Sequence, residues 1–165
     1  MNRETSNSEL DRLIPPEIKN DDFYAIIRKI ARESDIQTVL EIGSSSGGGS
    51  TEAFVTGLRD NPNRPTLYCM EVSQPRFAEL SSRYQNDNFV KCYNISSVAV
   101  EKFPTRQQVT DFYHNIADHN LKFYPVEQVL DWLRQDIDYV NHSGFASNGI
   151  AKIKQENRIE VFDLV

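Results

Sequence analysis

The sequence predicts an α/β protein built on a doubly wound parallel sheet, and three observations support this fold class. Three apolar runs, at 37–43, 66–72 and 88–95, are short and rich in β-branched or aromatic residues. The first run is too short for a helix and too apolar for an exposed strand, which is typical of a buried parallel strand. The runs alternate with helical patterns across short loops, and this alternation implies right-handed crossovers with helices on both faces.

Helical patterns surround these strands. The first begins behind a capping residue, Asn20 or Asp21, and ends near Ser34, so we expect an amphipathic helix that packs on the sheet. The second stops at Asn61-Pro62, and the third starts at Ser73 with Pro75 in its first turn. The apolar residues of the three patterns are Phe23, Ile26, Ile27, Ile30 and Ala31; Ala53, Phe54 and Leu58; and Phe77, Leu80 and Tyr84.

The alternation stops after Ser97, and residues 98–155 are a predicted helical insertion. Thr105 and Gln108 have capping-box spacing before one helix, and Pro125 opens another with a long apolar stripe. Residues 158–165 are rich in β-branched and aromatic residues, which predicts the start of a fourth strand. We therefore expect a polar arm, 1–20, and one domain, 21–165, whose sheet is truncated after the start of that strand, with the carboxy-terminal strands absent.

An incomplete sheet predicts a partner. The segment Ile159–Val165 would form an uncovered edge strand, and such an edge tends to pair with another chain. We expect a homo-oligomer, held through this strand or through the inserted helices.

Composition limits the other classes of partner. A formal net charge of −6 over 165 residues gives no basic footprint, which disfavours nucleic acid and anionic membranes. No apolar stretch approaches the ~20 residues of a membrane span, and the polar start MNRETSNSEL lacks a signal-peptide core. Cys69 and Cys92 lie in apolar runs, which indicates buried, reduced thiols. We expect a soluble, cytoplasmic protein.

The strongest functional signal is EIGSSSGGGST, which lies directly between a predicted strand and a predicted helix. Glycine in such a loop removes the Cβ that would block the close approach of a ligand. The start of the helix offers unpaired N–H donors with partial positive charge, which favour a carboxylate or a phosphate. Glu71 ends the second strand, where a carboxylate can accept both hydroxyls of a ribose. The loop and the acid together predict a nucleoside site.

The series Glu41-x-Gly43-x-Ser45-x-Gly47, followed by Glu71, resembles the first two motifs of class I S-adenosylmethionine-dependent methyltransferases, which have a Rossmann-like fold. The resemblance covers residues 21–97 and implies S-adenosyl-L-methionine as the cofactor. It implies methyl transfer to a small-molecule or side-chain acceptor, with this chain holding mainly the cofactor site. The glycine loop would cradle the methionine part and Glu71 the ribose, while Glu41 would help to fix the loop and the cofactor's amino end.

The resemblance assigns cofactor-binding residues at three places along the chain. They are Glu41, Gly43, Ser44, Ser45, Ser46 and Gly47; Glu71 and Val72; and, bordering the adenine, Asn94 and Ser96. The sequence departs from the family at Ser45, where a middle glycine is usual. Its Cβ narrows the room above the loop, so either its hydroxyl donates to the cofactor or the backbone rises slightly.

Two other functions stay open at this point. Gly43-x-Ser45-x-x-Gly48 partly meets the fingerprint of NAD-dependent oxidoreductases, although the missing middle glycine counts against a pyrophosphate. A non-catalytic nucleoside-binding or assembly module is the other alternative. No residue is assigned as a catalytic base.

The remaining polar residues give weaker signals. His114 and His119 fall on different faces of a helix and His142 falls in a predicted loop, so no metal site is expected. Trp132 is expected to pack against a helix partner. The aspartates around it, Asp131, Asp136 and Asp138, are expected to lie on a solvated helix face.

Overall fold

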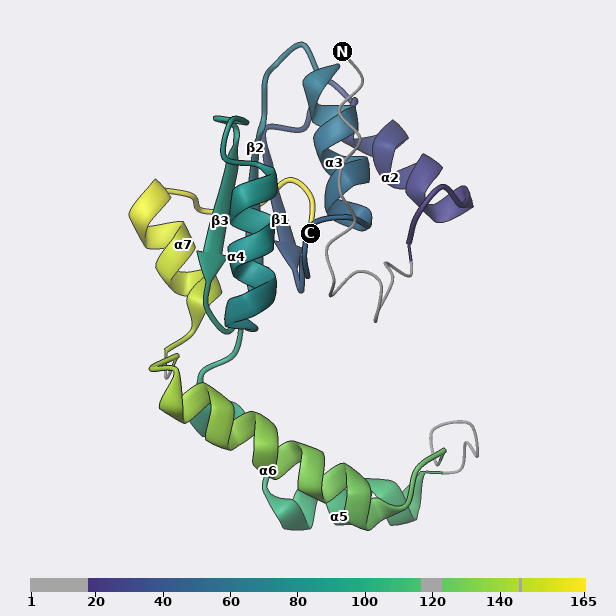
Figure 1. Ribbon diagram of the computed structural model, residues 1–165, viewed down its shortest axis with the longest axis vertical. Coiled ribbons are helices and arrows are strands. Elements are labelled where there is room, and N and C mark those ends of the chain that lie inside the picture. Colours follow the sequence, from purple (N-terminus) through teal and green to yellow (C-terminus); the bar gives the residue numbers. More distant parts are fainter. Residues whose placement is uncertain (1–17, 117–122, 146) are drawn as a thin grey trace. The chain divides into compact units, whose positions relative to one another are not determined.

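The structure, a computed structural model, describes residues 18–116, 123–145 and 147–165 (Figure 1). Most of the predicted polar arm, residues 1–17 of 1–20, lies outside the described residues, and so does His119. The chain forms two compact units. The first includes the described residues up to Ile95 together with Ile153–Val165, and the second is Ser96–Lys152.

A three-stranded parallel sheet, in the order β1-β2-β3, forms the centre of the first unit. The strands are β1 (Thr38–Ile42), β2 (Thr66–Glu71) and β3 (Val90–Asn94), one in each predicted apolar run. The α/β class and the three strands are therefore confirmed. Because all pairs are parallel, the carboxyl ends of the strands meet at one edge of the sheet.

Two helices, α3 (Ser50–Arg59) and α4 (Gln74–Arg83), follow β1 and β2 and cover one face of the sheet. Between the layers lie buried side chains of both: Val39, Leu67 and Cys69 from the strands, Ala53, Phe54, Val55 and Leu58 from α3, and Leu80 with the following Tyr84 from α4. Leu80 is fully buried, and the burial of such a side chain contributes roughly 2 kcal/mol. The helical periodicity predicted for these segments is confirmed.

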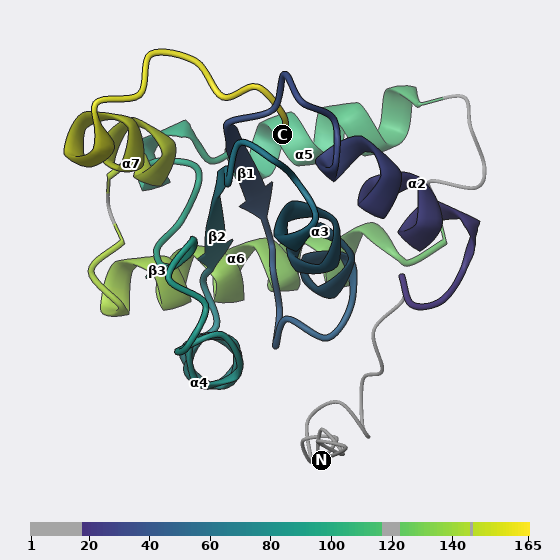
Figure 2. The same ribbon diagram turned by 90° about the horizontal axis from the view of Figure 1, so that it is seen from above.

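The helix α2 (Asp22–Ala31) lies beside α3 (Figure 2). Its start is capped as the sequence predicts, because the Asp21 carboxylate accepts from the Tyr24 N–H at 2.7 Å. Only half of its predicted apolar stripe is covered, since Ile27 and Ala31 are buried whereas Phe23 is 55% exposed. The helix therefore packs mainly on α3, and its buried residues share one core cluster with Val39 and Leu67 of the sheet.

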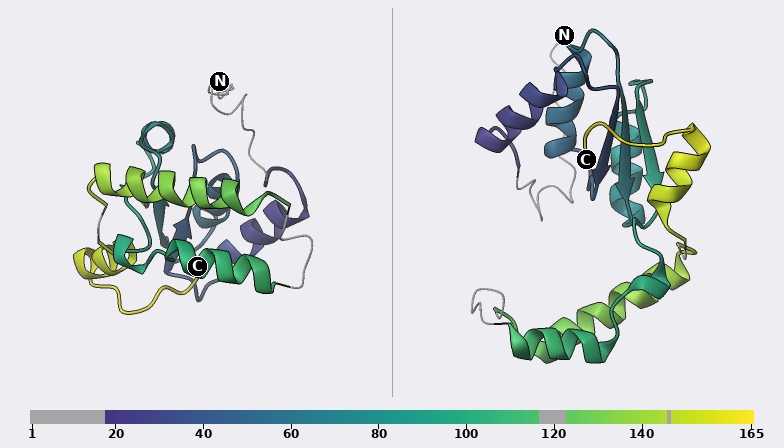
Figure 3. Two further views of the ribbon diagram at one scale, coloured as in Figure 1. Left: turned by 90° about the horizontal axis from the view of Figure 1, so that it is seen from below. Right: turned by 180° about the vertical axis from the view of Figure 1, so that it is seen from behind.

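The opposite face of the sheet carries aromatic side chains. Tyr68 of β2 and Tyr93 of β3 stack with ring centroids 6.5 Å apart. The end of α7 (Gly149–Asn157) lies on this side, where the Asn157 amide donates to the Tyr93 hydroxyl at 3.0 Å. Phe162 then meets the Tyr68 ring at 5.8 Å between centroids. The chain thereby crosses the sheet from β3 back to β1 (Figure 3, right).

The strand predicted over 158–165 is wrong in its extent. Only Leu164 pairs with β1, through a single parallel bridge to Val39. The Asp163 carboxylate accepts from the N–H groups of Gln37 and Thr38, at 3.0 and 2.8 Å, so a side chain takes donors that a neighbouring strand would use. An edge strand over 159–165 is therefore not formed, and the self-association expected from it stays a prediction.

In the described residues of the second unit, all the secondary-structure elements are helices. A short turn, η1 (Val100–Lys102), precedes α5 (Arg106–Asn115) and α6 (Val126–His142), which pack against each other. The predicted capping box is confirmed, because the Gln108 N–H donates to Thr105 Oγ1 at 3.2 Å and the Thr105 N–H donates to Gln108 Oε1 at 2.8 Å. Over the described ranges, no helix combines the length and the apolar character that a membrane crossing requires.

Replacement of Gly57 tests the contact between α2 and α3. An alanine in a helix interior ordinarily stabilises a protein by about 1 kcal/mol relative to glycine. Here a Cβ would lie 2.5 Å from the Arg28 carbonyl oxygen and 2.8 Å from the Ala31 Cβ. We expect Gly57→Ala to destabilise the protein by about 1–3 kcal/mol in urea denaturation, whereas Thr56→Ala next to it changes the stability little. A stabilised Gly57→Ala protein would show that the two helices are not in this contact.

The attachment of the carboxyl-terminal segment predicts a pH dependence. Hydrogen bonds from the Thr38 N–H, the Gln37 N–H and the Thr38 hydroxyl lower the pKa of the Asp163 carboxyl. The resulting stabilisation is fully present above the unfolded-state pKa of about 3.9 and is lost as the pH falls through the lower folded-state value. We expect Asp163→Asn to be less stable than the wild type at pH 7, and the difference to shrink in acid. The prediction would be contradicted if Asp163→Asn lowered the unfolding free energy equally at pH 7 and in acid. It would also be contradicted if Glu160→Gln lowered it as much as Asp163→Asn does.

Candidate functional site

The loop between β1 and α3 follows the end of the neighbouring strand. The N–H groups of Gly43 and Ser44 both donate to the Met70 carbonyl oxygen, at 2.9 and 3.0 Å. The chain turns by left-handed backbone at Gly43 (φ +82°), at Ser45 (φ +51°) and at Gly47 (φ +80°). Glycine adopts this conformation without strain, and its use at two of the three turns fits that preference.

Glu71 lies at the end of β2 and faces this loop. Its side chain is only 6% exposed. One carboxylate oxygen accepts from the Ser45 N–H at 2.8 Å and the other accepts from the Ser73 N–H at 2.7 Å. The structure therefore brings the predicted loop and the predicted acid into direct contact.

Glu41 fixes the far end of the loop. It lies on β1, is 7% exposed, and accepts from the hydroxyls of Ser50 and Thr51, each at 2.6 Å. These hydroxyls belong to the first turn of α3, so the strand end holds the helix start. The predicted role of Glu41 in fixing the loop has a structural basis. The sequence did not lead us to predict that Ser50 and Thr51 are its partners. The signal that could have identified them is the presence of two hydroxyl side chains at the start of a predicted helix.

The glycines of the loop have different surroundings. A Cβ on Gly43 would meet no atom within 4 Å, so the space beside it is open. A Cβ on Gly47 would lie 2.6 Å from a ring carbon of Tyr84 and 2.8 Å from Leu80. The Tyr84 hydroxyl also donates to the Gly47 carbonyl oxygen at 2.5 Å, and burial raises the pKa of this hydroxyl. Gly47 is thus required by packing against α4.

The serines of the loop lie in different environments. Ser45 is half-buried, and its hydroxyl is 3.4 Å from Nη1 of Arg76, a cation that the sequence analysis missed. The Ser44 hydroxyl is buried next to the Cys69 thiol and has no other partner in the described part of the chain. Ser46 is buried as well. Ser45 is therefore the serine of the three that is partly open to solvent.

The two residues predicted to border the adenine, Asn94 and Ser96, belong to different units. The Asn94 amide donates to the carbonyl oxygens of Glu71 and Val72, at 2.8 and 3.1 Å, so it holds the end of β2 in place. The Val72 side chain is 38% exposed beside this end. Ser96 belongs to the second unit, where its hydroxyl donates to the Val98 carbonyl oxygen at 2.7 Å. A role for Ser96 beside an adenine stays a prediction.

The start of α3 has donors without a side-chain cap. Its capping residue is Gly49, which has no side chain to accept a hydrogen bond. The first N–H groups of an α-helix have no partner within the helix, and the helix dipole places partial positive charge there. This helix start can therefore accept the carboxylate of a ligand.

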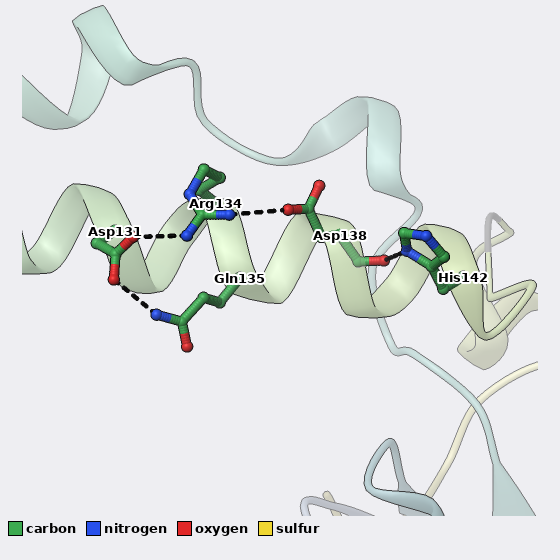
Figure 4. A network of polar contacts seen from close by, with 5 residues as sticks. All are labelled: Asp131, Arg134, Gln135, Asp138 and His142. Atoms are coloured by element: carbon green, nitrogen blue, oxygen red, sulfur yellow. Dashed lines mark hydrogen bonds and ion pairs between the residues drawn. The ribbon is translucent and has the colours of Figure 1, made fainter.

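The polar residues of α6 pair with one another along the exposed helix face (Figure 4). Arg134 contacts Asp131 at 2.7 Å and Asp138 at 3.2 Å. The hydrogen bond from Arg134 lowers the pKa of the Asp131 carboxyl. Such exposed pairs contribute little to stability, and the predicted solvated helix face is confirmed.

His142 and Trp132 also have local roles on this helix. His142 is the last residue of α6, so its predicted place in a loop is wrong; its Nδ1 lies 2.6 Å from the Asp138 carbonyl oxygen, one turn back along the helix. Trp132 meets the Tyr124 ring with centroids 4.8 Å apart. Among the residues that the structure describes, no group of three or more histidine, cysteine or acidic side chains could hold a metal ion.

Comparisons with known proteins identify no family for this chain. A scan against protein-family models finds no match. A search of curated proteins finds no significant similarity. The function is therefore inferred from the residues of the site.

Removal of one hydroxyl tests the contact between Glu41 and α3. Thr51→Val keeps the shape of a fully buried side chain but leaves one carboxylate oxygen of Glu41 without its donor. We expect a loss of about 1–3 kcal/mol in unfolding free energy, measured by urea denaturation. Thr56→Val is the matched control on the same helix, because its hydroxyl bonds only to the Glu52 carbonyl oxygen one turn back. Equal effects of the two substitutions would show that the Glu41 contact contributes nothing.

Proposed function

We propose that the first unit binds S-adenosyl-L-methionine and supports methyl transfer to a small-molecule or side-chain acceptor. The observation that carries this proposal is the contact between the glycine loop and Glu71 at the carboxyl edge of the sheet, where the Ser45 N–H lies 2.8 Å from the carboxylate. A loop and an acid that meet in this way can hold the two halves of a nucleoside ligand.

The course of the chain supports a ligand at this place. The strands β2 and β3 follow one another on one side of β1. The chain then returns across one face of the sheet, and Leu164 pairs with the other edge of β1. In a doubly wound sheet, ligands bind outside the carboxyl ends of the strands where the strand order reverses. Here the order would reverse at β1, and the loop that begins at Gly43 follows β1 directly.

Glu71 has the capacity to accept ribose hydroxyls. Each of its oxygens accepts one N–H bond from the protein, from Ser45 or from Ser73. An ionised carboxylate offers about four lone-pair directions, so one on each oxygen is left for a ligand hydroxyl. The exposed Val72 side chain next to it offers an apolar surface for a base.

The charge of the site favours a cationic ligand. Glu41 and Glu71 are both buried, and neither forms an ion pair among the described residues. Their partners are neutral hydroxyls and amides. S-adenosyl-L-methionine carries a sulfonium and an ammonium group, which these carboxylates would attract, whereas its carboxylate would suit the uncapped start of α3.

The chemistry would come from the cofactor, whose sulfonium makes the attached methyl group electrophilic. The protein would hold the cofactor and align an acceptor with that methyl group. Glu41 would act through Ser50 and Thr51 as a positioning residue, and Gly43 would leave room for the methionine part. No described residue is assigned to proton removal from the acceptor.

A nicotinamide dinucleotide is the competing ligand. Arg76 near Ser45 favours it, because a guanidinium can bind a phosphate. Two features count against it: the Ser45 Cβ hinders the close approach to the backbone that a pyrophosphate needs, and the carboxylates of Glu41 and Glu71 would repel its negative charge. Separate titrations with the two ligands distinguish these functions.

Isothermal titration calorimetry with S-adenosylhomocysteine tests the proposal. We expect binding in the micromolar range or tighter, and a dissociation constant raised about tenfold or more in Glu71→Gln, which loses the charge that accepts the ribose hydroxyls. Glu33→Gln, an exposed carboxylate away from the loop, is the control and should bind as the wild type does. Absence of binding at millimolar ligand, or preferential binding of NAD, would refute the proposal.

A further inference from the structure

The two cysteines of the chain stand opposite each other on neighbouring strands. Cys69 of β2 pairs with Cys92 of β3 in the parallel register, so both side chains project from the same face of the sheet. Cys69 is fully buried, whereas Cys92 is half-buried, and both are free thiols. The sequence places the residues 23 positions apart along the chain, and only the register brings them together.

The separation of the strands is compatible with a bond between the two sulfurs. Neighbouring strands lie about 4.8 Å apart, and the Cα atoms of disulfides are separated by about 4.4 to 6.8 Å. The Cβ atoms of a disulfide lie about 3.8 Å apart, which is closer than two parallel side chains stand on adjacent strands. A bridge here would draw the strands together, and strained disulfides of this kind are the more easily reduced ones.

The environment gives the two thiols different reactivities. Interaction with Cys69 lowers the pKa of the Cys92 thiol, and the same interaction, followed by burial, raises the pKa of the Cys69 thiol. Cys92 is also the one that solvent reaches. A small oxidant would therefore meet the Cys92 sulfur first, with the Cys69 thiol beside it on the neighbouring strand.

We propose that Cys69 and Cys92 form a reversible dithiol–disulfide pair that a hydroperoxide oxidises. The Cys92 thiolate attacks one peroxide oxygen, the O–O bond breaks, and the second oxygen leaves as hydroxide, giving a sulfenic acid on Cys92. The Cys69 sulfur then attacks the Cys92 sulfur, the S–S bond forms, and the sulfenic hydroxyl leaves with the Cys69 proton as water. The proton that Cys92 releases when it ionises converts the hydroxide to water, so in sum two thiols lose two electrons and hydrogen peroxide is reduced to two waters.

The cysteine pair lies next to residues of the candidate cofactor site. Cys69 precedes Glu71 by two residues on the same strand and the same face, and the Ser44 hydroxyl of the glycine loop lies next to its thiol. Movement of β2 towards β3 would therefore act on residues that hold the loop. The disulfide itself follows from the register and the burial, whether or not a cofactor binds there.

Oxidation of the native protein tests the pair. Reduced wild-type protein is treated with hydrogen peroxide, quenched, unfolded and alkylated with N-ethylmaleimide, and its intact mass and peptides are measured. We expect a monomer lighter by two hydrogen atoms, with no alkylated cysteine and a cross-linked Cys69–Cys92 peptide, and full alkylation after dithiothreitol. Two alkylated cysteines after peroxide treatment, a chain linked only to another chain, or oxygen adducts on Cys92 without the cross-link would overturn the proposal.

Two variants separate the roles of the thiols. In Cys69→Ser the second step is missing, so a sulfenic acid on Cys92 should accumulate and be trapped by dimedone. In Cys92→Ser the remaining thiol is buried, so its loss to peroxide should be at least about tenfold slower than the loss of thiol in the wild type. Circular dichroism checks that each variant is folded. Equal rates of thiol loss in wild type and Cys92→Ser would show that Cys92 is not the attacking residue.

Discussion

The end of β2 fixes the geometry of the candidate site. Three consecutive amides of the loop, those of Gly43, Ser44 and Ser45, donate to two consecutive residues of this strand, Met70 through its carbonyl oxygen and Glu71 through its carboxylate. These bonds hold the loop against the end of β2, beyond Ile42 and Met70, the last paired residues of the two strands. Because the loop is held on this side, the start of α3 is placed above the end of β1. The acid predicted to bind a ribose is in this structure also the group that shapes the loop.

The two glycines of the loop motif, Gly43 and Gly47, are needed for different physical reasons. Gly43 stands beside open space, so a ligand can approach its backbone, whereas a side chain at Gly47 would overlap Tyr84 and Leu80. Gly57, outside the motif, is needed for the close approach of α2 to α3. A sequence pattern treats the first two alike, because both are glycines with positive φ in one loop. Only the packing of α4 shows that the second glycine would be retained without any ligand.

Much of the fold could be predicted from local signals, because each depends on residues close in sequence. The Asp21 cap, the Thr105 and Gln108 capping box and the three strands are of this kind, and all are confirmed. The position of the loop and Glu71 at one edge of the sheet was predicted from the rule that parallel strands end there, whereas the hydrogen bond between them was not predicted. The pairing of Cys69 with Cys92 was not, since a pattern of apolar residues sets no register between strands. The prediction of a fourth strand was wrong for a related reason. The β-branched residues at 158–165 predict extended backbone, but the Asp163 carboxylate accepts from backbone N–H groups that strand pairing would need.

The buried carboxylates of Glu41 and Glu71 hold the loop and the start of α3, but neither has a cationic side chain as its partner among the described residues. A buried charge is expensive unless it is paired, and the partners of these two are neutral hydroxyls and amides. Hydrogen bonds from such donors offset part of the desolvation cost, and the partial positive charge at the start of α3 also favours the charged form of Glu41. A glutamine at position 71 has a single acceptor oxygen, so it could accept only one of the two N–H bonds that the Glu71 carboxylate accepts. Our proposal of a sulfonium-bearing ligand rather than a dinucleotide therefore rests on two buried acids that have no cationic side-chain partner among the described residues.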